Sequence, residues 1–138
     1  MDYTVQKYPE EPIVEFTVTE QFRIYDHMPD AVEEAYELLD GLDEDIYYVV
    51  DAGHLRLDFS GAVAALAMLA KGELALFRHS RIHKIVVAGK SRLLEMSAKA
   101  LGQAQYGGLT VYFYHTIEEA LTAVRAEIGG AKKMVSTF

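Results

Sequence analysis

The stretch that decides the fold is VVDAGHLRLDFSGAVAALAML, from Val49 to Leu69. It starts inside IYYVV, residues 46–50, a compact β-branched and aromatic run that predicts a buried strand ending at Asp51. It ends in GAVAALAMLA, whose small residues predict a helix packed closely against a sheet or another helix. Ser60 precedes that run and is a favoured residue type for the N-cap of the helix. A strand, a short loop and a helix in this order indicate an α/β fold.

The same alternation continues outward from this stretch to both ends of the chain. Alternating apolar residues predict strands at 13–18 and 22–25, paired as a hairpin. Pro29 and Asp30 are typical of a helix start, and Gly41 is typical of its end. Further strands are expected at 82–88 and 109–114, and further helices at 91–101 and 117–128 after a Thr116–Glu119 capping box. The order β-β-α-β-α-β-α-β-α predicts one mixed, mostly parallel sheet of about five strands with four helices.

Length and composition point to a single intracellular domain. The 138 residues leave room for one domain, expected at 13–128, with a flexible N-terminal arm at 1–12 and a basic tail at 129–138. The lack of Cys excludes disulfides, thiolate metal sites and cysteine nucleophiles. No apolar run reaches the ~20 residues of a membrane helix, and the polar N-terminus does not resemble a secretory signal. We therefore expect a cytoplasmic protein without membrane insertion.

Charge is unevenly distributed along the chain. The net charge is −8, but residues 1–60 hold 16 acidic and 3 basic side chains, whereas residues 61–138 hold 5 acidic and 10 basic ones. An acidic chain is a poor nucleic-acid binder, because such binding depends on basic groups that neutralise phosphates. We expect the two halves to attract each other within the fold or across a homodimer, the commonest kind of oligomer.

The stretch Val49–Leu69 resembles the STAS domain, the fold of sulphate-transporter tails and of SpoIIAA-like anti-sigma-factor antagonists. In that family a strand ends in Asp, as at Asp51, and a D-S-S/T-G-L-like turn opens a helix, as DFSGA does at 58–62. The segment TIEEAL, residues 116–121, resembles the end of the STAS sequence pattern. The segment VVAGKSRLLEMSAKALGQ, residues 86–103, also resembles SpoIIAA-like proteins grouped with lipid-binding Sec14-type domains.

The resemblance implies a non-enzymatic regulatory module that docks a protein partner, such as a kinase-type regulator. Its switch loop would comprise Asp51, Asp58, Ser60 and Gly61. Ser60 takes the position that is phosphorylated in antagonist members, although Phe59 replaces the first hydroxyl residue and the loop is one residue short. A phosphate at a helix N-terminus is stabilised by free N–H groups and remodels a docking surface by its charge. The alternative role for Ser60 is a helix cap alone.

A second loop offers another kind of site. AGKS, residues 88–91, resembles the end of a phosphate-binding P-loop, but Lys84 stands where the first glycine of that motif belongs. The large phosphate cradle is therefore absent. A smaller anion site at Gly89, Lys90 and Ser91 stays open, beside the reading that Ser91 is an ordinary helix cap. The alternative function is accordingly a small-molecule binding protein for an apolar, lipid-like or anionic ligand.

Catalytic and metal signatures are weak in this sequence. There is no G-x-S-x-G motif, and the acidic residues do not form an identifiable catalytic pair. His79 and His83 have the spacing of a helical metal pair, but His83 lies in a predicted strand, so we predict no metal site. We therefore predict no enzyme activity and no cofactor.

Overall fold

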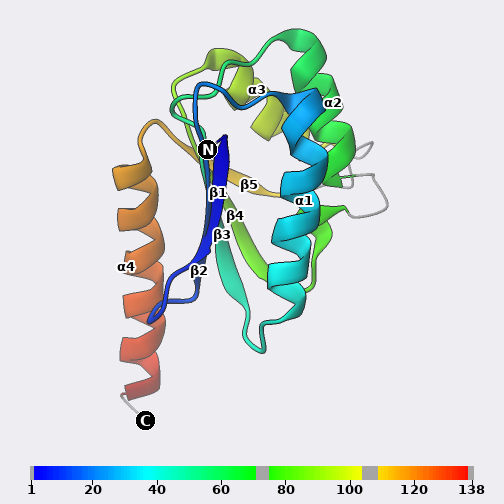
Figure 1. Ribbon diagram of the computed structural model, residues 1–138. Coiled ribbons are helices and arrows are strands. Elements are labelled where there is room, and N and C mark those ends of the chain that lie inside the picture. The colour runs from blue at the N-terminus through cyan, green and yellow to red at the C-terminus, as the bar shows by residue number, and fades with distance from the viewer. Residues whose placement is uncertain (1, 71–74, 104–108, 137–138) are drawn as a thin grey trace.

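A computed structural model describes residues 2–70, 75–103 and 109–136 of the chain. They form one five-stranded sheet with helices on both faces (Figure 1). The strands are β1 (Tyr3–Lys7), β2 (Ile13–Val18), β3 (Ile46–Asp51), β4 (Ile82–Ala88) and β5 (Val111–Tyr114). The helices are α1 (Ile24–Asp40), α2 (Phe59–Ala70), α3 (Arg92–Ala100) and α4 (Ile117–Ser136), with the short 3₁₀ helix η1 (Leu76–Arg78) before β4.

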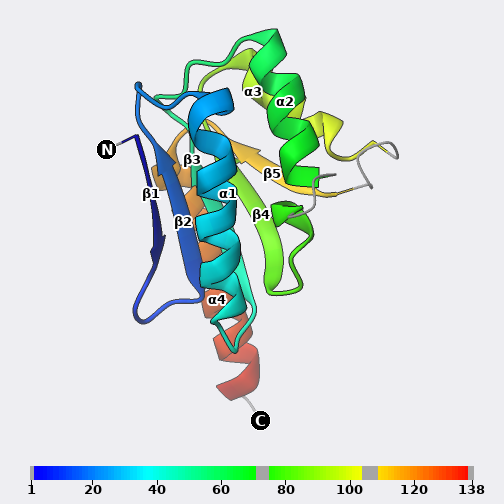
Figure 2. The ribbon, with the colours of Figure 1, turned by 45° about the vertical axis from the view of Figure 1, so that its right-hand side comes forward.

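The order of the strands across the sheet is the order of the strands along the chain. β1 pairs with β2 in antiparallel fashion, and β2, β3, β4 and β5 are parallel neighbours. Because parallel crossovers are right-handed, successive steps in one direction put their helices on one face of the sheet. α1, α2 and α3 accordingly cover one face and α4 lies alone on the other (Figures 1 and 2). The predicted mixed α/β sheet is confirmed.

The sheet separates two hydrophobic cores, because successive side chains of a strand point to opposite faces. The larger core lies under α1, α2 and α3 and includes Phe16 and Tyr48. The smaller core lies under α4 and includes Val49, Val86 and Val124. The two neighbours Tyr48 and Val49 therefore belong to different cores.

The N-terminal hairpin differs from the predicted one. Residues 1–12 were expected to be an arm, yet β1 lies within them and is the partner of β2. The reason is packing: the Tyr3 ring stacks on Phe16, with ring centroids 5.8 Å apart. Pro9 and Pro12 lie in the connection between the strands, outside both strands. The strand predicted at 22–25 does not form, because Phe22 instead meets the Phe16 ring edge-on.

Helix α1 begins earlier than predicted, at Ile24 instead of near Pro29. Ile24 and Met28 are both buried, so the additional residues contribute to the core. The side chain of Arg23, at the N-cap position, does not cap the helix. The backbone N–H of Arg23 instead donates a hydrogen bond to Nδ1 of His27, at 2.8 Å. Pro29 therefore lies inside the helix.

The C-terminal part also differs from the expected boundary. α4 continues to Ser136, so most of the predicted tail at 129–138 belongs to this helix. Ion pairs join the acidic first half of the chain to the basic second half, as the charge pattern predicted. Arg81 lies 3.6 Å from Asp45, and Arg125 lies 2.9 Å from Glu11.

Candidate functional site at the start of helix α2

The loop after β3 is shaped by two aspartates that bind backbone N–H groups. Oδ1 of Asp51 accepts from Gly53 N–H at 3.2 Å, and Oδ1 of Asp58 accepts from Gly61 N–H at 2.7 Å. The carbonyl of Asp58 also accepts from the N–H of Ala62, which makes Asp58 the N-cap of α2. Within the described residues no hydrogen bond joins Asp51 to Asp58 or Gly61, so the predicted switch loop contains two separate turns.

This geometry corrects the predicted role of Ser60 as the cap. Ser60 lies in the first turn of α2, two residues inside the cap. Its side chain is exposed, and its hydroxyl has no partner among the residues described. Since the carboxylate of Asp58 already binds the free N–H group, the Ser60 hydroxyl is not needed to start the helix.

Gly61 allows the first turns of α1 and α2 to approach each other. A Cβ atom at Gly61 would lie 3.0 Å from Oδ1 of Asp58 and 3.4 Å from Cγ1 of Ile24. A side chain there would therefore press on both the cap and the neighbouring helix. The glycine of DFSGA is explained by this close approach.

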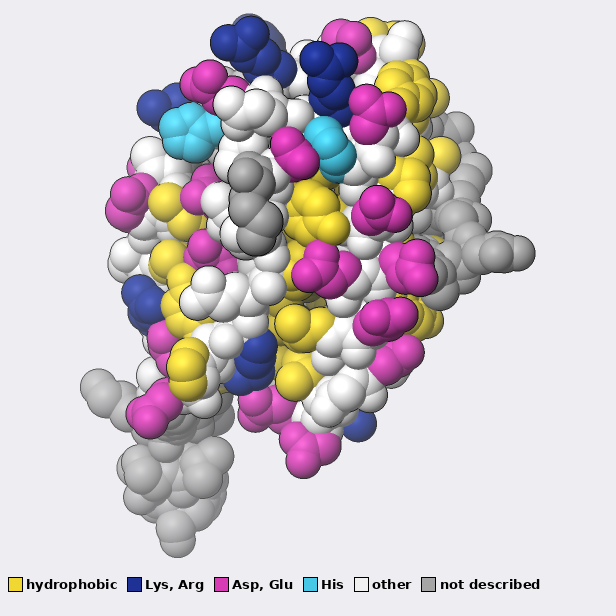
Figure 3. All heavy atoms as spheres, viewed as in Figure 1, with side chains coloured by type: hydrophobic (Ala, Val, Ile, Leu, Met, Phe, Trp, Pro, Cys, Tyr) yellow, Lys and Arg dark blue, Asp and Glu magenta, His cyan; other side chains and the backbone are white. Residues whose placement is uncertain are grey.

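Helix α2 exposes an apolar face beside Ser60. Phe59 is 74% exposed and Val63 is 47% exposed, and Ala67 is exposed on the same face. These three residues, at positions i, i+4 and i+8, are called the α2 stripe below. Ser60 borders the stripe, since it lies three residues before Val63. Figure 3 shows hydrophobic side chains reaching the surface over α2, next to acidic side chains over α1.

The loops that follow β3, β4 and β5 lie together at the carboxyl edge of the sheet. The N–H of Ala52, after β3, donates to the carbonyl of Ala88 at 2.8 Å. The N–H of Gly89, after β4, donates to the carbonyl of Tyr114 at 3.0 Å. Each loop is therefore attached to its neighbour by a backbone hydrogen bond.

The AGKS loop is built as a capped helix start. Oγ of Ser91 accepts from the N–H of Leu94 at 3.2 Å, which confirms Ser91 as the N-cap of α3. A Cβ atom at Gly89 would lie 2.3 Å from Cδ2 of Leu94, so the glycine lets α3 pack against the sheet edge. Lys90 is exposed. Anion binding at Gly89, Lys90 and Ser91 stays a prediction.

The two histidines at metal-pair spacing do not share a face. His79 is buried next to η1, where Nδ1 accepts from Arg81 N–H at 3.0 Å and Nε2 lies 2.8 Å from Oδ1 of Asp40. His83 is exposed on β4, with its ring 5.3 Å from that of Tyr47. Within the described ranges, no group of three or more potential metal ligands was found.

A feature that the sequence did not locate is a cavity of about 90 Å³ inside the larger core. It lies between the sheet and helices α1, α2 and α3, and its wall is almost entirely apolar. Tyr48 forms part of the wall. Periodicity alone does not show which volume inside a core stays unfilled.

The fold has a counterpart among solved structures. The chain is similar to an uncharacterized DUF3478-family protein from Shewanella loihica PV-4 that has a SpoIIAA-like fold. The two share 15% sequence identity over 88% of this chain and 91% of the other, with a TM-score of 0.53. No family model and no curated protein matches the sequence. The protein therefore has a SpoIIAA-like α/β fold, as the motifs predicted. No described helix has both the length and the apolar character needed to cross a bilayer.

Proposed function

We propose that this protein is a non-enzymatic docking module that binds a protein partner through the α2 stripe and releases it when Ser60 is phosphorylated. The observation that carries the proposal is the position of Ser60, which is exposed, borders the stripe and is not used as the helix cap. The SpoIIAA-like fold adds support. In that fold, the resemblance of DFSGA to the D-S-S/T-G-L-like turn implies that Ser60 takes the position phosphorylated in antagonist members.

The α2 stripe supports docking because its largest side chain is aromatic and mostly exposed. Aromatic side chains that enter a pocket of a partner contribute much of the binding energy of protein interfaces. The neighbouring helix α1 presents a band of exposed acidic residues. These are Asp26, Asp30, Glu33, Glu34, Glu37 and Asp40. The partner that fits this surface has an apolar pocket for Phe59 and basic groups beside it, facing α1.

Phosphorylation of Ser60 would act on the centre of this contact. A kinase-type regulator transfers the terminal phosphoryl group of ATP to Oγ of Ser60, with ADP as the leaving group and the hydroxyl proton released. The phosphoserine adds a charge of about −1.5 to −2, which the N-terminus of α2 tolerates. Against an apolar partner surface, however, the phosphate loses its hydrating water without gaining a hydrogen bond. The nearby carboxylate of Asp58 also repels it. The partner is therefore released.

The test is a quantitative pull-down from the lysate of the native host with four baits. These are the unmodified protein, Ser60→Ala, Ser60→Asp and Phe59→Ser. The charge control is Thr122→Asp, since Thr122 is exposed on α4, on the opposite side of the sheet. We expect one protein to bind the unmodified chain, Ser60→Ala and Thr122→Asp, and to be lost with Ser60→Asp and Phe59→Ser.

Two results would overturn the proposal. If all baits capture the same proteins, neither Ser60 nor the α2 stripe takes part in docking. If Ser60→Asp binds normally and Phe59→Ser does not, the stripe docks a partner but Ser60 is not its switch. Sedimentation of the same variants measures whether the stripe joins two copies of this chain. The homodimer and the cytoplasmic location stay predictions.

A further inference from the structure

Strand β1 forms one margin of the sheet, and its outer side is unpaired in the described part of the chain. The strand order begins with β1, so β2 is its only neighbour among the described strands (Figure 2). The strand contains neither proline nor glycine, and its register with β2 is unbroken. An edge of this kind offers a row of free backbone groups to another extended chain.

The hydrogen bonds at both ends of β1 show which of its backbone groups point outward. The N–H of Thr19 donates to the carbonyl of Asp2 at 3.1 Å, and the N–H of Tyr8 donates to the carbonyl of Ile13 at 2.9 Å. In an antiparallel pair, the residues that bond to the partner strand alternate along the chain. The even-numbered residues of β1 therefore bond to β2, and the N–H and C=O groups of the odd-numbered residues point away from the sheet. These residues are Tyr3, Val5 and Lys7.

The lysine of β1 does not protect this edge. An exposed lysine in an edge strand commonly keeps other chains away by its charge. The ammonium group of Lys7 is instead directed at its own chain. It donates to the carbonyls of Tyr8 and Glu11, and it lies 3.3 Å from the carboxylate of Glu44. The outer side of β1 therefore stays open to pairing.

Acidic side chains of α1 lie beside the same edge. The hydroxyl of Tyr3 is hydrogen-bonded to Glu34, and burial, this bond and the charges of Glu34 and Asp30 raise the pKa of Tyr3 to about 12. Neither carboxylate takes part in an ion pair within the described residues. Figure 3, in the view of Figure 1, shows the acidic side chains gathered over α1. A chain that pairs with β1 therefore meets negative charge that its own basic groups can balance.

We propose that β1 accepts an extended, basic peptide segment of another protein as a sixth strand of the sheet. The backbone of the peptide pairs with the outward groups of β1, and its lysine or arginine side chains on the α1 side meet Asp30 and Glu34. Pairing with the β1 edge of a second copy is disfavoured, because it gathers the carboxylates of both copies along one junction. The edge is separate from the α2 stripe, since no residue of β1 belongs to that stripe.

The first test compares three seven-residue peptides with blocked ends. In the first peptide lysine alternates with valine, and in the second glutamate replaces lysine. The third is the lysine peptide with every backbone amide methylated, which keeps the charges and removes the hydrogen-bond donors. Isothermal titration calorimetry measures the affinities. We expect the lysine peptide to bind at least about tenfold more tightly than either of the other two.

Amide hydrogen exchange shows where the peptide binds. In the free protein, the outward N–H groups of Tyr3, Val5 and Lys7 should exchange fast, whereas those of Thr4 and Gln6 are protected by β2. At saturation, the lysine peptide should slow exchange of the three outward amides by about tenfold, as expected for one new hydrogen bond at each. Exchange at Thr4 and Gln6 should change much less.

Protein variants separate strand pairing from charge attraction. Val5→Pro removes one outward N–H and no bond to β2, so it should weaken the lysine peptide by about tenfold. The far-ultraviolet circular dichroism of this variant shows whether the fold persists, and the methylated peptide tests the same bonds in the unmodified protein. Asp30→Asn with Glu34→Gln should weaken binding by about fivefold. The matched control, Glu118→Gln with Glu119→Gln on α4, removes equal charge and should weaken binding much less.

Three results would overturn the proposal. One is that the lysine peptide leaves exchange at the three outward amides unchanged. Another is that the methylated peptide binds as tightly as the unmethylated one, because binding then rests on charge alone. The third is that the outward amides are already protected in the free protein, increasingly so at higher protein concentration, because a second copy of the chain then occupies the edge.

Discussion

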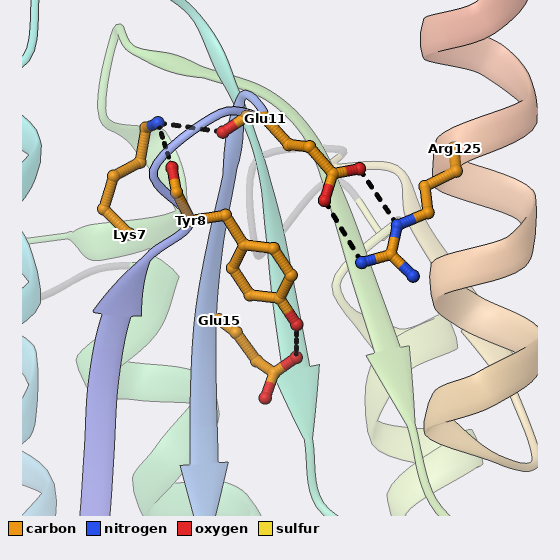
Figure 4. A network of polar contacts seen from close by, with 5 residues as sticks. All are labelled: Lys7, Tyr8, Glu11, Glu15 and Arg125. Atoms are coloured by element: carbon orange, nitrogen blue, oxygen red, sulfur yellow. Dashed lines mark hydrogen bonds and ion pairs between the residues drawn. The ribbon is translucent and has the colours of Figure 1, made fainter.

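Arg125 on α4 donates two parallel hydrogen bonds to the carboxylate of Glu11, which lies in the connection between β1 and β2. Nε of the arginine lies 2.9 Å from Oε2 of the glutamate, and a terminal guanidinium nitrogen lies 3.1 Å from Oε1 (Figure 4). The same connection is bound from the other side by Lys7, which donates to the carbonyls of Tyr8 and Glu11. Helix α4 is thereby attached to the N-terminal hairpin.

Replacement of Arg125 by Lys should weaken this attachment slightly. Lysine cannot form the paired hydrogen bonds, but the pair is partly exposed, so the free energy of unfolding should fall only slightly. Urea denaturation at low salt measures the loss, and high salt should remove most of it. Glu11→Gln is the matched control and should lose a similar amount. A loss that is unchanged by salt would argue against an electrostatic origin.

The cap of α2 can be tested by two neighbouring alanine substitutions. Asp58→Ala should lower the free energy of unfolding by about 1 kcal/mol, because it removes the acceptor for Gly61 N–H. Ser60→Ala should change it by only a few tenths of a kcal/mol, since its hydroxyl binds nothing in the described structure. Thermal denaturation of both variants and of Asp58→Asn, which keeps an acceptor, gives the comparison. The opposite ranking would restore Ser60 as the cap.

The stability of the protein should fall at high pH. Burial and the hydrogen bond to Glu15 raise the pKa of Tyr8 from 10.0 to about 12. The folded state therefore holds this proton more tightly than the unfolded state does. The resulting stabilisation is complete below pH 10 and is lost as the pH rises through about 12. As the pH rises across this range, the urea concentration at the midpoint of unfolding should fall less steeply for Tyr8→Phe than for the unmodified protein. An equal slope for both proteins would contradict the prediction.

The hydrogen bond between buried His79 and exposed Asp40 makes a further prediction. Nδ1 of His79 accepts from Arg81 N–H, so Nε2 carries the proton and donates to Asp40. Asp40→Ala removes the acceptor, but Asp40 is 63% exposed and water can take its place, so the free energy of unfolding should fall by only about 1 kcal/mol. Asp40→Asn keeps an oxygen in place and should cost less. Chemical denaturation distinguishes the two, and equal losses would show that the acceptor is not important.

The parts of the fold that were predicted correctly have strong periodic patterns. The run IYYVV is recognised as a strand because its β-branched and aromatic residues pack on both faces of the sheet. The helix after it is recognised by its many alanines, which favour helix. β1 was missed because two prolines follow it closely, although they lie only in the connection to β2. The start of α1 was predicted too late because Pro29 is typical of a helix start. Burial of Ile24 and Met28 instead extends the helix to residues before the proline.

The candidate site was harder to predict for two physical reasons. Asp58 and Ser60 are equally favoured as N-caps, and a shift of two residues decides which one binds the backbone. The cavity depends on how completely side chains from three helices fill one volume, which no local pattern records. The alternation in IYYVV does place Tyr48 and Tyr47 on opposite faces, but it does not show that one hydroxyl lacks a partner.

The strand order has a consequence for how the chain folds during synthesis. Since each strand joins the edge left by the strand before it, no strand has to enter between two strands that are already paired. The sheet can therefore grow in one direction as the chain leaves the ribosome, from the N-terminal hairpin to β5. Because α4 packs against β3, β4 and β5, the second face of the sheet stays uncovered until α4 has been synthesised. The addition of α4 thus buries an apolar surface that the nascent sheet would otherwise expose.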